Sequence, residues 1–362
     1  MDLHVRGVVL PDGVERDVFV VDGRFSFHQV ADAETVLDGG WLVPGLVDTH
    51  AHLGLASPAP PGVSDQEAAR ASARAQLAAG VLAVREPGGP NRASTGIGPD
   101  QGLARTFTGG RFLASPAGYF PGLACQVPAE ALAEAAEQEA QASGAWAKVI
   151  GDFPGPDGRL RANFEPETLA EAAQRVHAVG ARIAIHSMGL AEVVEAAIAA
   201  GFDSIEHGLS LETEHLAAMV AGEVAWVPTL TIFVDRDPIR GLLGGLGMPA
   251  GDVAALVAAI DRQPEVVREA AAAGVLVLAG TDAGMGPHGK IAGEVRLLLD
   301  AGLPPEHALG AASWEARRFL GLAVIEEGAP ADLVAYPDDP RGDPRVLGRP
   351  ALRILDGHLI ET

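Results

Sequence analysis

Short apolar segments and amphipathic segments alternate through most of the 362-residue chain. The apolar segments are rich in Val, Ile, Leu and Ala, and Ala- and Glu-rich segments with helical spacing follow most of them. This alternation is typical of parallel βα units. We expect strands at residues 45–49, 81–85, 111–115, 146–150, 181–185, 203–206, 223–229 and 275–279. We expect helices at residues 65–79, 128–142, 165–179, 190–200 and 253–273.

The two ends of the chain have a different pattern of short β segments separated by turns. Turn signals between apolar segments near the N-terminus are Pro11-Asp12-Gly13 and Asp22-Gly23. Residues 332–360 likewise consist of short β segments separated by turns. We therefore predict that residues 1–44 and 327–362 pair into one small β-sandwich domain. Residues 45–326 then form an α/β domain, for which a TIM-like (β/α)8 barrel is the simplest closure of eight parallel strands.

Polar side chains that can bind metal stand at or near the ends of five predicted strands. Two histidines lie two residues apart, so both point to the same side of their strand. A lysine in an apolar strand is costly to bury as an ammonium ion. Each residue alone is typical of a polar strand end, but active sites of such barrels form where all these ends meet. The six residues are His50, His52, Lys148, His186, His207 and Asp282.

In this order, these motifs resemble the amidohydrolase superfamily of metal-dependent hydrolases, over essentially the whole chain. The segments that carry the resemblance are residues 44–52, Lys148, His186, Glu206-His207-Gly208 and residues 280–284. Residues 286–289, 294–298 and 327–334 are similar to the branch that contains imidazolonepropionase-like proteins and Xaa-Pro dipeptidases.

The resemblance implies a binuclear metal site. His50, His52 and Asp282 would bind the more buried ion, and His186 and His207 the more exposed one. Lys148, converted by CO2 to a carbamate, would bridge the two. These ligands suit Zn²⁺, with Mn²⁺, Co²⁺ or Fe²⁺ as alternatives. The expected reaction is cleavage of a C–N bond in a small amide, cyclic amide or dipeptide-like molecule by a metal-bridging hydroxide, with Asp282 as general acid and base.

Further side chains near the predicted strand ends are candidates for substrate contact. Arg85 can hold a carboxylate or form an ion pair, and Tyr119 can donate a hydrogen bond or simply fill space. Asp48 shares the direction of the histidine pair and is expected one layer below the metals, mainly as a structural acid. The candidates for substrate contact are Tyr119, His288, Arg85, Phe153 and Phe233.

Composition narrows the classes of partner. The net charge of −22 disfavours nucleic acid and anionic membranes. Cys125 is the only cysteine, so no intramolecular disulfide can form. Without a recognisable signal peptide or membrane span, we expect a cytoplasmic protein that acts on a small molecule; whether it forms a homo-oligomer stays open.

Three alternative functions remain at this point. The same site can hydrolyse a lactone, a carbamate or a phosphotriester. A mononuclear deaminase is disfavoured because Lys148 would then have no bridging role. A catalytically silent scaffold is disfavoured because no ligand of the set is missing.

Overall fold

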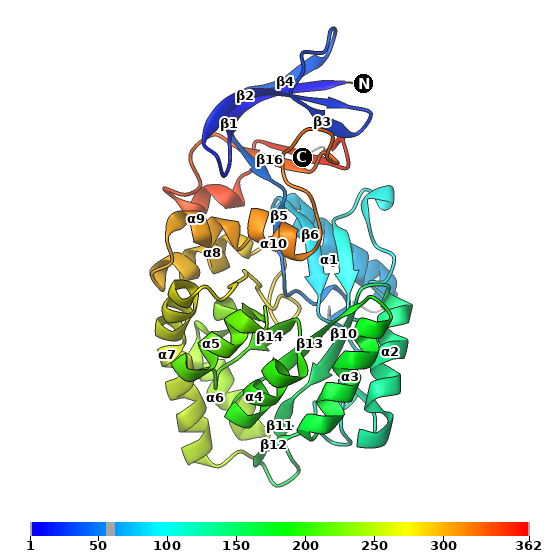
Figure 1. Cartoon of the computed structure of the whole chain (residues 1–362), viewed down its shortest axis with the longest axis vertical. Helices are drawn as coiled ribbons and strands as arrows, with labels where there is room; N and C mark the ends of the chain where they lie inside the picture. Colours follow the sequence, from blue (N-terminus) through cyan, green and yellow to red (C-terminus); the bar gives the residue numbers. More distant parts are fainter. Residues whose placement is uncertain (1, 56–61, 361–362) are drawn as a thin grey trace.

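The two ends of the chain meet in one seven-stranded sheet. The computed structural model describes residues 2–55 and 62–360, and the strands of this sheet follow the order β18-β17-β16-β4-β1-β2-β3. Strand β4 pairs in parallel with β1 and antiparallel with β16, and so joins the N-terminal to the C-terminal strands. The sheet forms a separate layer at one end of the molecule (Figure 1). Its strands are β1 Leu3–Val9, β2 Val14–Val21, β3 Arg24–Ser26, β4 Glu34–Pro44, β16 Leu333–Tyr336, β17 Leu352–Leu355 and β18 His358–Leu359.

The remaining strands form a ring of eight parallel segments. Seven of them are regular strands, and residues 275–279 fill the eighth place through a bridge between Trp226 and Val277. The backbone N–H of Thr49 donates to the carbonyl of Ala279 at 3.0 Å and closes the ring, so the predicted barrel is confirmed. The regular strands of the ring are β5 Leu46–Asp48, β6 Val81–Glu86, β8 Phe112–Ala114, β10 Trp146–Ile150, β13 Arg182–Ser187, β14 Ser204–His207 and β15 Ala225–Val227. Strand β7 Arg105–Thr108 pairs in parallel with β6 and comes just before β8 in the chain, so β7 and β8 together occupy the third place of the ring. Short strands outside the ring are β9 Cys125–Gln126, β11 Asp152–Pro154 and β12 Leu160–Ala162.

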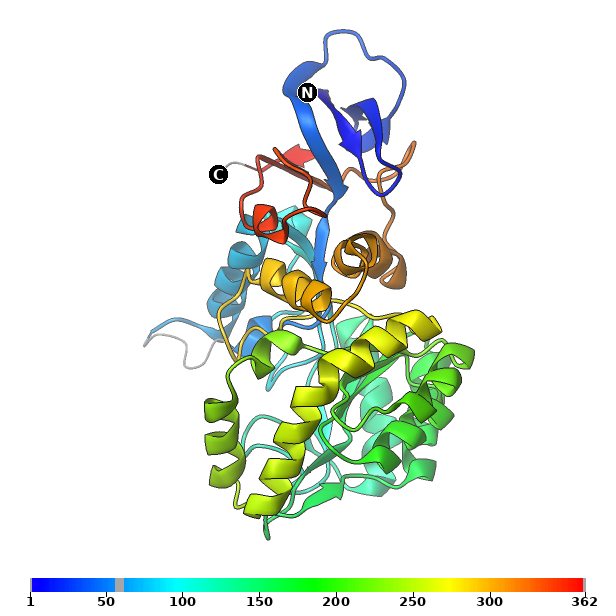
Figure 2. The same ribbon diagram turned by 90° about the vertical axis from the view of Figure 1, so that its left-hand side faces the viewer.

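Helices surround the ring (Figures 1 and 2). The five helices predicted from the sequence correspond to α1, α2, α3, α4 and α7. The sequence analysis did not predict α5, α6, α8, α9 or α10; in α6, Pro238 and several glycines weaken the helical pattern. None of the described helices has the length and hydrophobicity needed to cross a bilayer. The helices are α1 Asp65–Ala78, α2 Leu132–Ser143, α3 Pro166–Ala178, α4 Ala191–Ala200, α5 Thr213–Ala221, α6 Arg236–Gly245, α7 Ala250–Ala273, α8 Ile291–Asp300, α9 Pro305–Gly310 and α10 Trp314–Phe319.

Strand β4 of the sheet leads directly into β5 of the barrel, with only Gly45 between them (Figure 2). A Cβ atom at Gly45 would lie 2.5 Å from the side chain of Leu82, so the close approach of β5 and β6 requires glycine here. The sheet is therefore attached at the start of the strand that leads to His50 and His52.

A buried ion pair also joins the barrel to the sheet. Arg317 of α10 donates to the carboxylate of Asp332 at 3.0 Å, and both side chains are buried. Asp332 lies just before β16 and also accepts a hydrogen bond from the backbone of Asp356 at 2.8 Å. The next cation is Arg105, whose guanidinium lies 3.8 Å from Asp332. The pair thus links a helix of the barrel to two segments of the C-terminal sheet.

Replacing Arg317 with leucine should destabilise the protein, because the buried carboxylate of Asp332 loses its main partner. We expect the free energy of unfolding to fall by about 3 kcal/mol, measured by chemical denaturation. Arg318→Leu, at an exposed position of the same helix, serves as the control and should change stability by less than about 0.5 kcal/mol. Equal stabilities of the two variants would contradict this role of the ion pair.

Candidate metal centre

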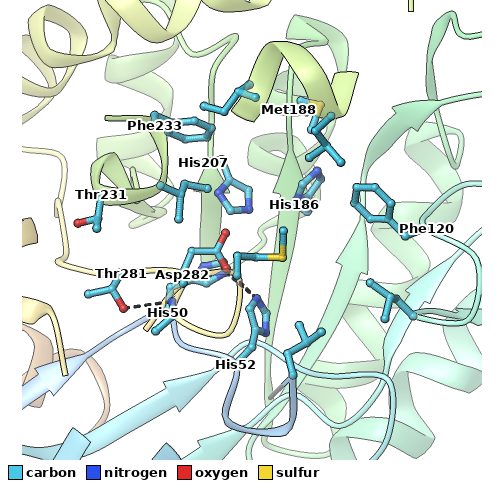
Figure 3. A pocket seen from close by; sticks show the side chains of 18 of the residues that line it. His50, His52, Phe120, His186, Met188, His207, Thr231, Phe233, Thr281 and Asp282 are labelled. Carbon is cyan, nitrogen blue, oxygen red and sulfur yellow. Dashed lines mark hydrogen bonds and ion pairs between the residues drawn. The ribbon is translucent and has the colours of Figure 1, made fainter. Parts of the chain in front are cut away.

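The six side chains expected to bind metal all line one cavity at the carboxyl ends of the ring strands. The two adjacent histidines follow β5, and the lysine lies within β10. The other two histidines lie at the ends of β13 and β14, and the aspartate follows the segment 275–279. Figure 3 shows His50, His52, His186, His207 and Asp282 directed toward a common space.

His50, His52 and Asp282 form a cluster of three electron-rich groups. The Nε2 atoms of the two histidines are 3.2 Å apart, and one oxygen of Asp282 lies 3.4 and 3.0 Å from them. The Nδ1 atom of His50 lies 2.5 Å from Glu206, and that of His52 lies 2.7 Å from the carbonyl oxygen of Gly88. In the metal-binding tautomer each Nδ1 atom keeps its proton for these acceptors, and each Nε2 atom presents a lone pair to the space that it shares with the carboxylate. A shared cation would relieve this crowding of lone pairs, so the three residues fit a metal site.

His186 and His207 form a second pair of imidazoles at the cavity that could bind a metal ion. Their ring centroids are 4.7 Å apart, and the centroid of His207 is 5.0 Å from that of His50. The Nδ1 atom of His207 donates to the hydroxyl of Thr229 at 2.8 Å, which leaves its Nε2 atom free. The buried Nε2 atom of His186 has no hydrogen-bond partner among the described residues. Burial and the neighbouring Lys148 lower the pKa of His186 to about 3, so the ring is neutral and able to bind metal.

Lys148 is buried among these ligands. Its amine has no hydrogen-bond partner in the described part of the chain. Burial lowers the pKa of Lys148 to about 7, even though the charges of Glu206 and Asp282 act in the opposite direction. A large fraction of the amine is therefore uncharged near neutral pH and can react with CO2. The lone buried amine fits the carbamate bridge that the resemblance implies.

Glu206 holds His50 in place and is itself held by Arg85. Its carboxylate accepts two hydrogen bonds from Arg85, at 2.8 and 2.9 Å, and one from the hydroxyl of Ser204 at 2.6 Å. Burial alone would raise the pKa of Glu206, but Arg85, Lys148 and His50 outweigh it and hold this pKa well below the usual value. Arg85 is fully buried and absent from the cavity lining. Arg85 thus forms an ion pair, which the sequence analysis gave as the alternative to holding a substrate carboxylate.

Asp48 lies below the cluster, as expected, and fixes the loop that carries Asp282. Its carboxylate accepts hydrogen bonds from the backbone N–H and the hydroxyl of Thr281, at 3.0 and 2.6 Å, and from Gln76 at 3.0 Å. A Cβ atom at Gly280 would lie 2.5 Å from the Cβ atom of His50, so only glycine lets the two strand ends come this close.

Two of the candidate ligands have strained backbone conformations. His207 has a φ of 64° and Asp282 a φ of 52°, in the left-handed region that residues with a Cβ atom rarely adopt. Thr229, which binds His207, has a φ of 50°. The residues after Thr229 are held by Glu294, whose carboxylate accepts hydrogen bonds from the backbone of Leu230 and Thr231. These strained turns direct the ligand side chains into the cavity at the ends of their strands.

The cavity has a volume of about 690 Å³, enough for a small organic molecule. Of the predicted substrate contacts, Tyr119 and Phe233 line it. Phe153 lies behind the lining, with its ring centroid 5.0 Å from that of Tyr119. His288 also lies outside the lining, with its Nδ1 atom 3.5 Å from the amide nitrogen of Gln76. Two of the five candidates therefore line the cavity, and Arg85, Phe153 and His288 lie outside its lining.

The sequence analysis missed several residues that support the site. Glu206 was visible as the neighbour of His207, and its position in an apolar strand was the available signal. Thr229 and Gln76 gave no such signal, because their roles depend on contacts between distant segments. Glu294 lies in the segment 294–298 that carries the branch resemblance, but its contact with Leu230 and Thr231 could not be read from the sequence.

Comparison with known proteins agrees with the geometry. The model of the amidohydrolase family matches residues 41–355. An uncharacterized protein of Mycobacterium tuberculosis (strain H37Rv) is 38% identical over 358 residues, which cover 98% of this chain and 95% of that protein. A crystal structure of an Xaa-Pro dipeptidase with bound methionine superposes with a TM-score of 0.85 at 22% identity, over 100% of both chains. The A. niger ochratoxinase structure has a TM-score of 0.79 at 19% identity, over 99% of this chain and 95% of that one. These two structures share the fold.

The hydrogen bond from His207 to Thr229 can be tested by replacing Thr229 with valine, which has the same shape and no acceptor. We expect metal affinity to fall by about 10- to 100-fold, because His207 loses the group that fixes its tautomer and orientation. The affinity is measured by competition with a chelator. Thr213→Val, at the exposed start of α5, is the control. Unchanged affinity of Thr229→Val would mean that the contact does not prepare His207 for metal.

Proposed function

The chain belongs to the amidohydrolase family, and we propose that it hydrolyses a carbon–nitrogen bond in a small amide, cyclic amide or dipeptide-like molecule with two divalent metal ions. The observation that carries this proposal is the convergence of four histidines, an aspartate and an unpartnered buried lysine on one cavity. No other cluster of the described residues combines three His, Cys, Asp or Glu groups at metal-binding distances.

The donor set divides into two parts joined by the lysine. His50, His52 and Asp282 would hold one ion, His186 and His207 the other, and a carbamate on Lys148 would contact both. Neutral imidazoles and carboxylates suit Zn²⁺, with Mn²⁺, Co²⁺ or Fe²⁺ as alternatives. When bound, the ions would lower the pKa of water and polarise the scissile carbonyl.

Asp282 is the residue proposed to move the proton. Burial alone would raise its pKa, but His50 and His52 outweigh burial and hold the pKa of Asp282 well below the usual value, so it is a carboxylate. It can accept a proton from the attacking water and deliver it to the departing nitrogen. The phenol of Tyr119, whose ring centroid is 5.8 Å from that of His186, is the proposed hydrogen-bond donor to a substrate oxygen.

Replacing Lys148 with alanine should remove the bridging ligand and most of the activity. Short carboxylic acids such as acetate or propionate should partly restore turnover, since their two oxygens can occupy the place of the carbamate. Lys148→Arg should not recover activity, because guanidinium keeps its charge and does not form a carbamate. Turnover by Lys148→Ala at the wild-type rate would exclude a bridging role for this lysine.

The function itself is tested by measuring amide hydrolysis with the metal-loaded wild type and Asp282→Asn. The asparagine keeps the shape but removes the base, and kcat should fall by at least about 100-fold. Asp300→Asn, an exposed position on α8, is the control and should keep wild-type kcat. Metal content is determined for each protein, so that loss of metal is separated from loss of the base. Hydrolysis of lactones or phosphotriesters in preference to every amide tested would replace the proposed reaction.

A further inference from the structure

Lysine is exceptionally scarce in this chain, and its placement is not random. Of the 26 basic residues only Lys148 and Lys290 are lysines; the others are arginines. Both lysines line the cavity described above. Lys148 is accounted for by its place among the ligands, whereas Lys290 has no role in the proposed metal centre. The placement of both lysines at one cavity indicates that Lys290 also has a function there.

Lys290 occupies a position that is unfavourable for the stability of its helix. It is the N-cap residue of α8, and its side chain forms no capping hydrogen bond. Acceptor side chains are favoured at this position, and a cation there is repelled by the partial positive charge of the helix N-terminus. Among the ion pairs of the described residues none involves Lys290, whereas Arg296 of the same helix pairs with Asp300 at 3.5 Å. The ammonium is therefore not explained by folding or by a local partner.

The cavity around Lys290 is mostly apolar. Phe120, Phe233 and Ile239 line it, and Met285 and Leu242 are 58% and 41% exposed and so mark its opening to solvent. Lys290 is also exposed, while the ligands below are buried. Among the described residues that line the cavity, no arginine is present and Lys290 is the only cation outside the metal centre. Residues 56–61, whose structure is not described, include no basic side chain.

We propose that Lys290 binds a carboxylate of the substrate at the mouth of the cavity. The substrate is then an amphipathic amide with a single negative charge: an apolar body contacts the walls, the scissile amide reaches the metal centre, and the carboxylate stays near solvent. One cation matches one negative charge, and in a chain of net charge −22 it supplies the local attraction that such a substrate needs. This inference rests on the proposed function for the reaction, but assigns the substrate class and a specificity-determining residue.

A matched pair of substrates tests the assignment. N-phenylacetyl-leucine carries the carboxylate, and N-phenylacetyl-leucinamide is its neutral counterpart; release of phenylacetate reports cleavage of the same bond in both. The holoenzyme is compared with Lys290→Met, which keeps the apolar stem, and with Lys290→Arg, which keeps the charge. Arg296→Met on the exposed face of α8 is the control.

We expect Lys290→Met to lower the ratio of kcat/KM for the carboxylate to that for the amide by at least about fivefold, mainly through KM. Lys290→Arg should retain the preference, and raising the salt concentration should weaken it in the wild type but not in Lys290→Met. The thermal midpoint of Lys290→Met should be unchanged or higher, since a cation leaves the helix N-terminus. An unchanged ratio, an equal loss for both substrates, or a lower midpoint would overturn the assignment.

Direct binding separates this inference from the proposed function. If the wild type hydrolyses neither compound, calorimetric titration of both compounds into the wild type and Lys290→Met measures recognition without turnover. If only the carboxylate compound binds more weakly to Lys290→Met than to the wild type, the role of Lys290 in carboxylate binding is supported even though the proposed reaction has failed. Equal binding of each compound to the two proteins would overturn the role of Lys290.

Discussion

The buried amine of Lys148 is the constraint on which the rest of the site depends. An ammonium ion without a partner is expensive in an apolar barrel, and burial accordingly lowers the pKa of Lys148 to about 7. Conversion to a carbamate would replace this unfavourable cation with an anionic ligand of two oxygens. Together with this carbamate, the four histidines and Asp282 would form one set of metal ligands. The near absence of lysine elsewhere supports this interpretation, because in this chain a basic residue is otherwise almost always arginine.

The candidate ligands are positioned by hydrogen bonds to residues that do not line the cavity. Glu206 with Arg85 orients His50, Thr229 orients His207, and Asp48 fixes the loop of Asp282. Two of the ligands also occupy left-handed backbone conformations that a chain selected only for stability would avoid. The site therefore depends on the packed interior of the barrel, which holds the strained strand ends in place.

The barrel and the meeting of the six candidate side chains at one cavity could be predicted, because both follow from local patterns. The spacing of apolar residues indicated the strands. Strand ends meet at the carboxyl-terminal face of a barrel, which places there the side chains of His50, His52, His186, His207 and Asp282. The cavity walls could not be predicted in this way. Helix α6 has a weak helical pattern, yet Ile239 and Leu242 line the cavity from it. His288 and Phe153 follow strand ends in the sequence, but both lie outside the cavity lining, where they contact Gln76 and Tyr119.

The most direct test of the account is a crystal structure of the zinc-loaded protein with diffraction data at the zinc absorption edge. The account predicts two anomalous peaks, one among His50, His52 and Asp282 and one at His186 and His207, with a carbamate on Lys148 between them. A single peak in fully active protein, or an unmodified Lys148 that contacts neither ion, would contradict it.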